Sequence, residues 1–268
     1  MKPAEILRSL EKTARKRFGQ NFLVNPKVAE EMITAAELKN TDTVVEIGPG
    51  LGALTEELIK KAGRVIAIEL DRDLAEYLRN RRLPQVTVVT GNSLDIDWTV
   101  TIGNDYKIVA NIPYSITSPV LRKIFQLENR PSVAILLIQK EMAERIVAPA
   151  GSSERGFLTL LTEANAEVKI VGKVKPGSFH PMPKVDSAII KVTPSERKME
   201  TILWPAVEAA FRHKRQTLVN ALTKDLPLKR SELEKFLKKN AWNPLIRPSE
   251  LTFADWQTLS KEIKNQLD

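Results

Sequence analysis

An apolar run over residues 106–112 ends in a tetrapeptide that combines an amide, a rigid bend and an aromatic ring. The tetrapeptide is Asn111-Ile112-Pro113-Tyr114. Proline has no amide hydrogen to donate to a sheet ladder, so a strand formed by this run must stop at Pro113. Taken alone, Asn111 is best explained as a turn cap and Tyr114 as half-buried core. A neighbouring ligand site would change that balance, because an amide oxygen accepts hydrogen bonds and an aromatic face stacks on planar groups.

A glycine-rich segment, Gly48-Pro49-Gly50-Leu51-Gly52, supplies the signal of such a site. It follows a predicted strand and opens a helical pattern, and its glycines let the backbone turn tightly and approach a ligand closely. Glu46 stands at the end of the otherwise apolar strand, where a carboxylate is costly unless it has a partner. Glu69 ends the next predicted strand, at a spacing where an acidic side chain can accept hydrogen bonds from ribose hydroxyls. The segment therefore predicts a nucleotide-type cofactor, although a lone glycine loop is weak evidence.

The spacing of the glycines excludes two common nucleotide sites. A dinucleotide fingerprint needs a third glycine at position 53, which is Ala, and a phosphate-cradling loop needs a Lys-Ser or Lys-Thr pair, which is missing. The form E-x-G-x-G-x-G after the first strand resembles the loop of S-adenosylmethionine-dependent methyltransferases. Asn-Pro-Pro-Tyr-like tetrapeptides mark the members that methylate exocyclic amino groups, and residues 111–114 resemble the variant found in RNA adenine methylases.

Strand and helix patterns alternate over residues 43–194. The predicted strands cover 43–48, 64–70, 86–91, 106–112, 132–139, 167–174 and 187–194. Near-continuous apolar strands separated by helical stretches indicate a mostly parallel sheet with both faces covered. The last two strands have no helix between them, so one of them is expected to run antiparallel at or near the sheet edge. The fold class is thus α/β, a Rossmann-like domain with a seven-stranded, mostly parallel sheet.

A second, smaller domain is expected after a charged linker at residues 193–200. From there only helical patterns occur, over 205–222, 231–242 and 252–267. The predicted domains are 1–194, which binds the cofactor, and 195–268, which is all-helical. The second stretch holds 14 Lys and Arg against 10 Asp and Glu, the same excess that the much longer first stretch reaches with 27 against 23.

Composition narrows the class of protein further. A hydrophobic content of 43% and a charged content of 28% are those of a globular protein, and no uncharged apolar run approaches the ~20 residues of a membrane span. The polar N-terminus shows no secretory signal. Cysteine is absent and only His180 and His213 are present, so neither disulfides nor a histidine-built metal site is expected. We expect a cytoplasmic protein without a metal, and the net charge of +8 is compatible with a polyanionic partner.

Blocks along nearly the whole chain resemble the small-subunit ribosomal RNA adenine dimethyltransferase family. They are KRFGQNFL (16–23), EIGPGLGALT (46–55), NIPYSITSP (111–119), QKEMAERI (139–146), KPGSFHPMPKVDSAIIKV (175–192), AFRHKRQTLVNAL (210–222) and RPSELTFADWQTL (247–259). These enzymes place two methyl groups on each of two adjacent adenosines near the 3′ end of that RNA. The nearest relatives of the family are erythromycin-resistance methylases of large-subunit RNA and mitochondrial transcription factors. The resemblance implies S-adenosylmethionine as cofactor and a role in maturation of the small ribosomal subunit.

The resemblance also assigns residues to the cofactor. They are Asn21, Leu23, Gly48, Gly50, Glu69, Asn92 and Asn111. It places Gly48 and its loop against the amino-acid part of the cofactor and Glu69 against the ribose. Asn111 is expected beside the methyl group that is transferred. One position departs from the family pattern, because Asn92 stands where an Asp usually contacts the adenine amino group.

Catalysis is expected to consist mainly of positioning, since the cofactor already carries an excellent leaving group. The exocyclic nitrogen of adenine is a poor nucleophile because its lone pair is delocalised into the ring. The Asn111 side-chain oxygen and the Ile112 carbonyl are the proposed acceptors for its hydrogens. Pro113 fixes the bend that aims the carbonyl, Tyr114 offers a stacking face, and Phe179 is expected to be a second one.

The expected partner is small-subunit ribosomal RNA, in an immature subunit, bound by a monomer that does not contact a membrane. Candidate RNA contacts are Arg15, Lys16, Arg17, Arg212, Lys214 and Arg215. Residues 148–157 are expected to form a mobile loop beside the substrate. Three alternatives stay open: a non-catalytic RNA-binding or assembly factor on the same fold, a large-subunit rRNA adenine methylase, and a DNA adenine methylase.

Overall fold

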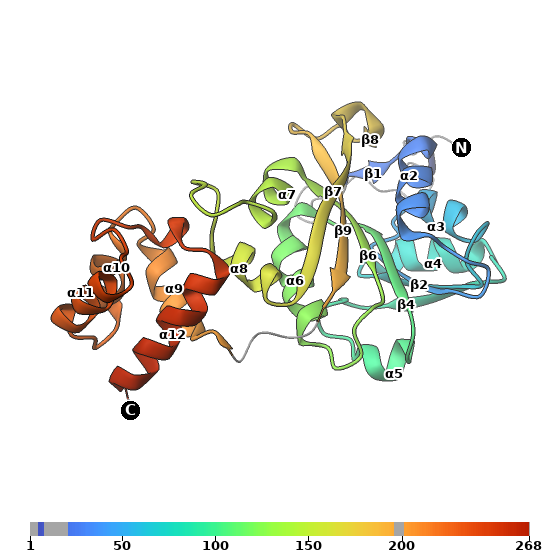
Figure 1. The fold of residues 1–268 in the computed structure, drawn as a ribbon. Coiled ribbons are helices and arrows are strands. Elements are labelled where there is room, and N and C mark those ends of the chain that lie inside the picture. Colours follow the sequence, from blue (N-terminus) through green and yellow to red (C-terminus); the bar gives the residue numbers. More distant parts are fainter. Residues whose placement is uncertain (1–4, 8–20, 196–200, 268) are drawn as a thin grey trace. The chain divides into compact units, whose positions relative to one another are not determined.

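The computed structural model describes residues 5–7, 21–195 and 201–267, and the chain divides into two compact units (Figure 1). One unit comprises the chain up to Ala143 together with Val168–Pro194. The other comprises Glu144–Glu167 and the chain from Ser195 onward. Three of the candidate RNA contacts, Arg15, Lys16 and Arg17, lie outside the described residues. No described helix is both long enough and apolar enough to cross a membrane.

A seven-stranded sheet is the centre of the first unit, in the order β4-β3-β2-β5-β6-β9-β7. Its strands are β2 (Thr43–Ile47), β3 (Arg64–Glu69), β4 (Val86–Thr90), β5 (Lys107–Asn111), β6 (Ala134–Gln139), β7 (Ala166–Val174) and β9 (Ser187–Pro194). The neighbours from β4 to β6 pair in parallel, whereas β9 pairs antiparallel to β6. The predicted seven-stranded, mostly parallel α/β fold is confirmed, and the antiparallel strand lies one place inside the edge.

The central strands β2, β5 and β6 are buried except at their ends. All residues of β6 from Ala134 to Ile138 are inaccessible to solvent. Because successive side chains of a strand point to opposite faces, this burial shows that helices cover the sheet on both sides. The helices of this unit are α2 (Pro26–Ala36), α3 (Ala53–Leu58), α4 (Arg72–Asn80), α5 (Trp98–Ile102), α6 (Thr117–Gln126) and the start of α7 (Lys140–Ile146). The edge strand β4 is only partly buried.

A second, two-stranded sheet joins β1 (Phe22–Leu23) to β8 (Phe179–His180). The strands are antiparallel, with Leu23 opposite Phe179. Their two-residue length gives no periodicity, so the sequence patterns do not reveal them. The pairing fixes the segment that begins at Asn21 to the body of the first unit.

The second unit is helical. It contains α8 (Phe157–Glu163), α9 (Trp204–Arg212), α10 (Leu218–Asp225), α11 (Arg230–Lys239) and α12 (Phe253–Leu267), packed around the fully buried Trp256. The helix expected over 205–222 is broken, because α9 ends at Arg212 and Thr217 caps the start of α10 by accepting a hydrogen bond from the Asn220 amide. Lys214 and Arg215 therefore lie in a turn and not on a helix face.

The expected domain boundary at residue 194 separates the two units except for one segment, 144–167, which belongs to the helical unit. This segment precedes β7 in the chain but groups with the helices. The reason is apolar contact: Leu160 of α8 is fully buried in the helical core, and Phe157 packs against that core. The helical unit is thus built from two separate stretches of chain.

Candidate cofactor and substrate site

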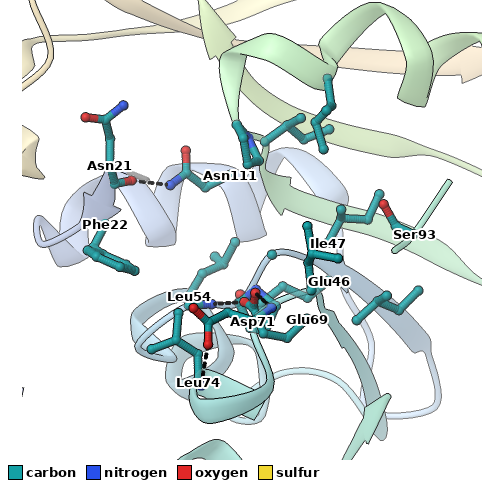
Figure 2. A pocket seen from close by; sticks show the side chains of 18 of the residues that line it. Asn21, Phe22, Glu46, Ile47, Leu54, Glu69, Asp71, Leu74, Ser93 and Asn111 are labelled. Atoms are coloured by element: carbon teal, nitrogen blue, oxygen red, sulfur yellow. Dashed lines mark hydrogen bonds between the residues drawn. The ribbon is translucent and has the colours of Figure 1, made fainter. Parts of the chain in front are cut away.

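A pocket of about 280 Å³ lies where β2, β3 and β5 end (Figure 2). It is lined by the last residues of these strands and by the segments that follow them, such as Glu46, Glu69 and Asn111. Open α/β sheets bind ligands at the carboxyl ends of their parallel strands, and pockets for small molecules start at roughly this volume. The fold therefore defines one ligand site in the first unit.

Most of the predicted site residues meet in this pocket. Those that line it are Asn21, Leu23, Gly48, Gly50, Glu69, Asn92, Asn111, Ile112, Pro113 and Tyr114. Asn21 and Asn111, for example, are 90 residues apart in the chain. The structure adds residues that the sequence patterns did not single out, among them Phe22, Asp71 and Ser93. For Asp71 a signal existed, since it caps α4 two residues after Glu69.

Phe179 is placed apart from the other predicted site residues, and its stacking role stays a prediction. It does not line the pocket, and its side chain is only 4% exposed within the core cluster that contains Leu23. Its burial depends on the pairing of β8 with β1, which no local sequence pattern predicts.

The glycine loop needs glycine for its conformation and for its contacts. Gly48 and Gly50 have φ angles of 67° and 57°, in the left-handed region that other residues rarely adopt. A Cβ atom on Gly50 would lie 2.9 Å from the ring of Phe22. The backbone of the glycine loop therefore lines the pocket next to the Phe22 ring.

The carboxylate of Glu69 is held rigidly in the pocket. One oxygen accepts from the Gly50 amide at 3.0 Å and the other from the Asp71 amide at 2.9 Å. Burial raises the pKa of Glu69, and the two N–H groups oppose that change. Each oxygen keeps a second lone pair, so Glu69 can still accept hydrogen bonds from a ligand's hydroxyls.

Glu46 is the most deeply buried carboxyl group of the pocket. It is 1% exposed, and the Thr55 hydroxyl donates to its Oε2 atom at 2.6 Å. Burial, together with the nearby charge of Glu69, raises the pKa of Glu46 to about 8. The Glu46 carboxyl group is therefore mostly protonated at neutral pH.

The ionisable side chains that line the pocket are all acidic. Glu46, Glu69 and Asp71 all line it, whereas the described lining residues include no Lys, Arg or His. Within the described part of the chain, no acidic or histidine cluster has a geometry that could hold a metal ion. The acidic side chains other than the protonated Glu46 favour a ligand with positive charge and disfavour one with phosphate groups.

The amide of Asn111 has a defined orientation. Its Nδ2 atom donates to the backbone carbonyl of Asn21 at 3.0 Å, as Figure 2 shows. Because the nitrogen is assigned to that bond, the Oδ1 atom occupies the other branch of the amide and can act as an acceptor. The β1 segment thus sets the orientation of the side chain at the end of β5.

Asn92 also has its amide orientation fixed. Its Oδ1 atom accepts from the Leu94 amide at 3.1 Å, and its Nδ2 atom donates to Asp95 at 2.8 Å. The loop behind it is fastened from α6, where the Lys123 ammonium donates to the carbonyls of Leu94 and Ile96, both at 2.7 Å. One lone pair of Asn92 Oδ1 therefore remains for a ligand.

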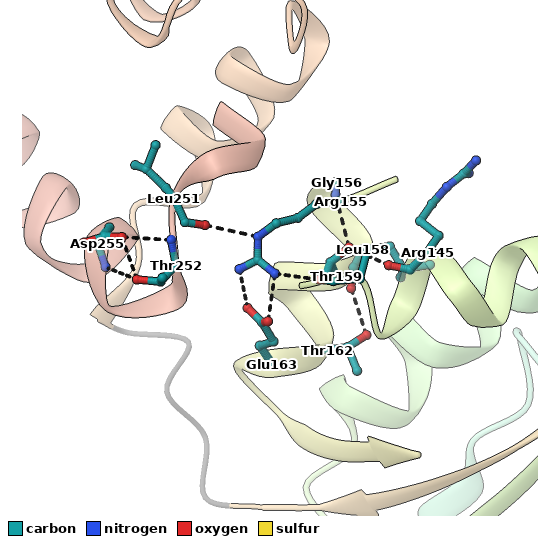
Figure 3. Close-up of polar contacts among 11 residues, drawn as sticks. Arg145, Arg155, Gly156, Leu158, Thr159, Thr162, Glu163, Leu251, Thr252 and Asp255 are labelled. Atoms are coloured by element: carbon teal, nitrogen blue, oxygen red, sulfur yellow. Dashed lines mark hydrogen bonds and ion pairs between the residues drawn. The ribbon is translucent and has the colours of Figure 1, made fainter. Parts of the chain in front are cut away.

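In the second unit, the segment 148–157 is anchored through Arg155, and its expected mobility stays a prediction (Figure 3). Arg155 is 1% exposed and forms a bidentate pair with Glu163, at 2.8 and 2.7 Å. Its guanidinium also donates to the carbonyls of Ala148 and Leu251. A single buried cation therefore connects α8, the preceding loop and the segment before α12.

The candidate RNA-binding cations of the second unit differ in their surroundings. Arg212 pairs with Asp225 at 2.6 Å, which partly neutralises its charge. The Lys214 ammonium donates to the Ser153 carbonyl at 3.0 Å, while Arg215 is exposed. Lys214 and Arg215 thus present positive charge from a turn that lies against the anchored loop.

The fold and the pocket together define a Rossmann-like methyltransferase. Its architecture is similar to that of a dimethyladenosine transferase from Plasmodium falciparum, with a TM-score of 0.76 and 28% identity over 91% of this chain and 98% of that one. It is also similar to the 23S rRNA methyltransferase ErmE, with a TM-score of 0.69 and 27% identity over 91% of this chain and all of that one.

Sequence comparison gives the particular family. Residues 11–264 match the ribosomal RNA adenine dimethylase family. A protein named ribosomal RNA small subunit methyltransferase A from Dehalococcoides mccartyi strain CBDB1 is 38% identical, covering 96% of this chain and 91% of that protein. A protein of the same name from Clostridium acetobutylicum is 36% identical, covering 92% of this chain and 93% of that protein. The chain belongs to the ribosomal RNA adenine dimethylase family.

Removing the partner of the buried guanidinium should destabilise the protein. In Glu163→Ala the Arg155 charge stays buried without its carboxylate, so the free energy of unfolding should fall by about 3 kcal/mol. Urea denaturation measures this. The matched control is Glu232→Ala, which removes an exposed partner of Lys235 and should cost less than about 1 kcal/mol. Equal losses in the two variants would contradict the importance of burial.

The raised pKa of Glu46 predicts a specific dependence of stability on pH. Between its ordinary pKa of 4.5 and about 8, the folded protein holds a proton that the unfolded chain has lost. The contribution of Glu46 to the free energy of unfolding should therefore fall as pH rises through this interval, by up to about 1.4 kcal/mol per pH unit. Glu46→Gln cannot titrate and should have a flatter stability profile. Parallel profiles for the parent and Glu46→Gln in urea denaturation would exclude this.

Proposed function

We propose that this protein transfers methyl groups from S-adenosylmethionine to the exocyclic amino nitrogens of two adjacent adenosines near the 3′ end of small-subunit ribosomal RNA. The observation that carries the proposal is a pocket with three carboxyl groups and no described cation, bordered by Asn111 and Tyr114. S-adenosylmethionine bears a sulfonium and an ammonium group, whereas dinucleotides and nucleoside triphosphates bear phosphates. The charge of the pocket supports the former.

The lining residues fit the parts of this cofactor. Glu69 is placed to accept hydrogen bonds from the ribose hydroxyls, and the loop of Gly48 and Gly50 leaves room for the amino-acid part. Asn92 presents an acceptor oxygen for the adenine amino group, with Asp95 holding its amide in that orientation. When bound, the cofactor supplies a methyl group on a sulfonium, which leaves as a neutral thioether.

The chain's own contribution is to orient and polarise the target nitrogen. Asn111 Oδ1 and the Ile112 carbonyl accept hydrogen bonds from its two N–H groups and thereby localise the lone pair on nitrogen. The nitrogen gains the methyl carbon and loses one proton to water. Pro113, with φ −52° and ψ 128°, turns the chain after Ile112 so that the carbonyl is available at the strand end.

The substrate base must be extracted from its stack to reach the pocket, and Tyr114 supplies a face for it. Lys214 and Arg215 contribute charge for the flanking phosphates. The proposed substrate is an immature small subunit in the cytoplasm, and the protein acts on it as a monomer, giving dimethyladenosines during subunit maturation.

Transfer of tritium from labelled S-adenosylmethionine tests the proposal. Immature small subunits should be labelled to about four methyl groups each, while large-subunit RNA and DNA should not. Labelling of large-subunit RNA alone would indicate the activity that the name of ErmE states. Binding to small subunits without any transfer would indicate a non-catalytic assembly factor.

Asn111→Ala should slow methyl transfer far more than it weakens cofactor binding. The lost acceptor acts on the developing charge of the target nitrogen, for which a loss of about 100-fold in kcat is typical. Single-turnover kinetics and calorimetry measure the two quantities. Asn220→Ala, in the helical unit, is the control and should resemble the parent. A near-normal single-turnover rate in Asn111→Ala would refute its role.

Asn92 and Asp95 should respond as a pair. Asn92→Asp alone gains a charged acceptor for the adenine amino group but places a like charge beside Asp95, so its affinity for S-adenosylmethionine should change little. The double variant Asn92→Asp/Asp95→Asn restores the hydrogen bond and should bind tighter by about 1 kcal/mol. Calorimetry on the parent, both single variants and the double variant separates these effects. An equally tight Asn92→Asp would show that Asp95 has no influence.

A further inference from the structure

The structure contains a hydrogen bond that reaches the substrate side of the pocket from the antiparallel strand. We propose that Ser187, the first residue of β9, is a positioning residue that holds the Tyr114 ring in the orientation in which it stacks on the target base. The inference rests on the proposed function, since it specifies how the base-binding side of that same site is prepared. It adds a residue from a segment 73 positions away from Tyr114.

The topology explains why β9 can contribute to the site. Because β9 runs antiparallel to β6, it begins where β6 ends, and Ser187 is paired with Gln139. Since β5 and β6 are parallel, their carboxyl ends lie side by side. Ser187 is thereby brought to the edge from which Tyr114 projects. A parallel strand in this place would have brought its last residue there instead.

The contact itself is short and shielded. The Tyr114 hydroxyl and Ser187 Oγ are 2.7 Å apart, and Ser187 is completely buried. A buried hydroxyl without a partner is costly, so both groups favour this arrangement. Burial also raises the pKa of Tyr114, which keeps its hydroxyl protonated and able to donate.

The two ends of Tyr114 are held independently. Its backbone begins a 3-10 turn (Tyr114–Ile116) in which the Ile116 amide donates to the Pro113 carbonyl at 3.0 Å. The Thr117 hydroxyl donates to the Tyr114 carbonyl at 3.3 Å. The turn therefore constrains the backbone of Tyr114, and the bond to Ser187 constrains its ring.

This arrangement distinguishes a positioning role from a catalytic one. Tyr114 lines the pocket and Ser187 does not, so Ser187 acts on a base only through the ring. A ring that is free to rotate loses that freedom when a base stacks on it, and this loss weakens binding. The bond to Ser187 orders the ring before the base arrives. Its removal should therefore lower kcat/KM for RNA without changing the affinity for S-adenosylmethionine.

A double-mutant cycle tests the inference. Ser187→Ala and Tyr114→Phe should each lower kcat/KM for immature small subunits by roughly 2- to 10-fold, the range for one neutral hydrogen bond. The double variant should lose no more than either single variant, because all three lack the same bond. Calorimetric affinity for S-adenosylmethionine should equal that of the parent in all of them. Ser260→Ala, the same change at a buried serine of the helical unit, is the control for general destabilisation and should keep the parent's kcat/KM.

The outcomes are decisive in either direction. The inference would be overturned if the losses in kcat/KM of Ser187→Ala and Tyr114→Phe multiplied in the double variant. It would also be overturned if Ser187→Ala kept the kcat/KM of the parent. Either result would leave the proposed function intact. A fall in cofactor affinity equal to the fall in kcat/KM would also overturn it, because Ser187 would then support the pocket as a whole. A parent protein that transfers no methyl group would overturn the proposed function and the inference together.

Discussion

The carboxylate of Glu69 joins the three segments from which the cofactor pocket is built. It ends β3, binds the amide of Gly50 in the loop after β2 and binds the amide of Asp71 at the start of α4. The two hydrogen bonds tie the glycine loop and the start of α4 to the same side chain. Burial makes this arrangement costly for a charge, and two N–H donors are what make it tolerable. The shape of the pocket and its negative character thus have a common origin.

The side-chain amides of two asparagines determine which hydrogen-bonding groups the pocket can offer to a ligand. Asn111 and Asn92 each direct their nitrogen to a fixed partner, Asn21 in one case and Asp95 in the other. An asparagine can present either a donor or an acceptor, and the partner decides which one faces a ligand. In both places the oxygen is left as the acceptor that a ligand can use. A ligand and a substrate that each carry an amino group are the natural complement of such a surface.

The sheet was predictable because its strands are long apolar runs, and burial on both faces requires nothing more than such runs. The glycine loop, Glu69 and residues 111–114 were predictable because they stand at the ends of those strands, where a parallel sheet gathers its ligand contacts. Phe179 was not, because its environment is decided by a two-residue pairing with β1. The break between α9 and α10 was missed because the apolar spacing continues through it, while the Thr217 cap and the turn override that spacing. The bond between Tyr114 and Ser187 joins residues with no relation in sequence, so only the strand order reveals it.

The buried guanidinium of Arg155 has a consequence for the order in which the chain can fold during synthesis. All strands of the large sheet are complete once residue 194 has been made, and domains generally fold as they emerge. Arg155 and Leu160 belong to the helical unit, yet they are made before β7 and β9. They must wait for Leu251 and for the helices after Ser195 before they are covered. Until the last helices are made, the segment inserted before β7 therefore lacks the apolar residues that cover it in the folded protein.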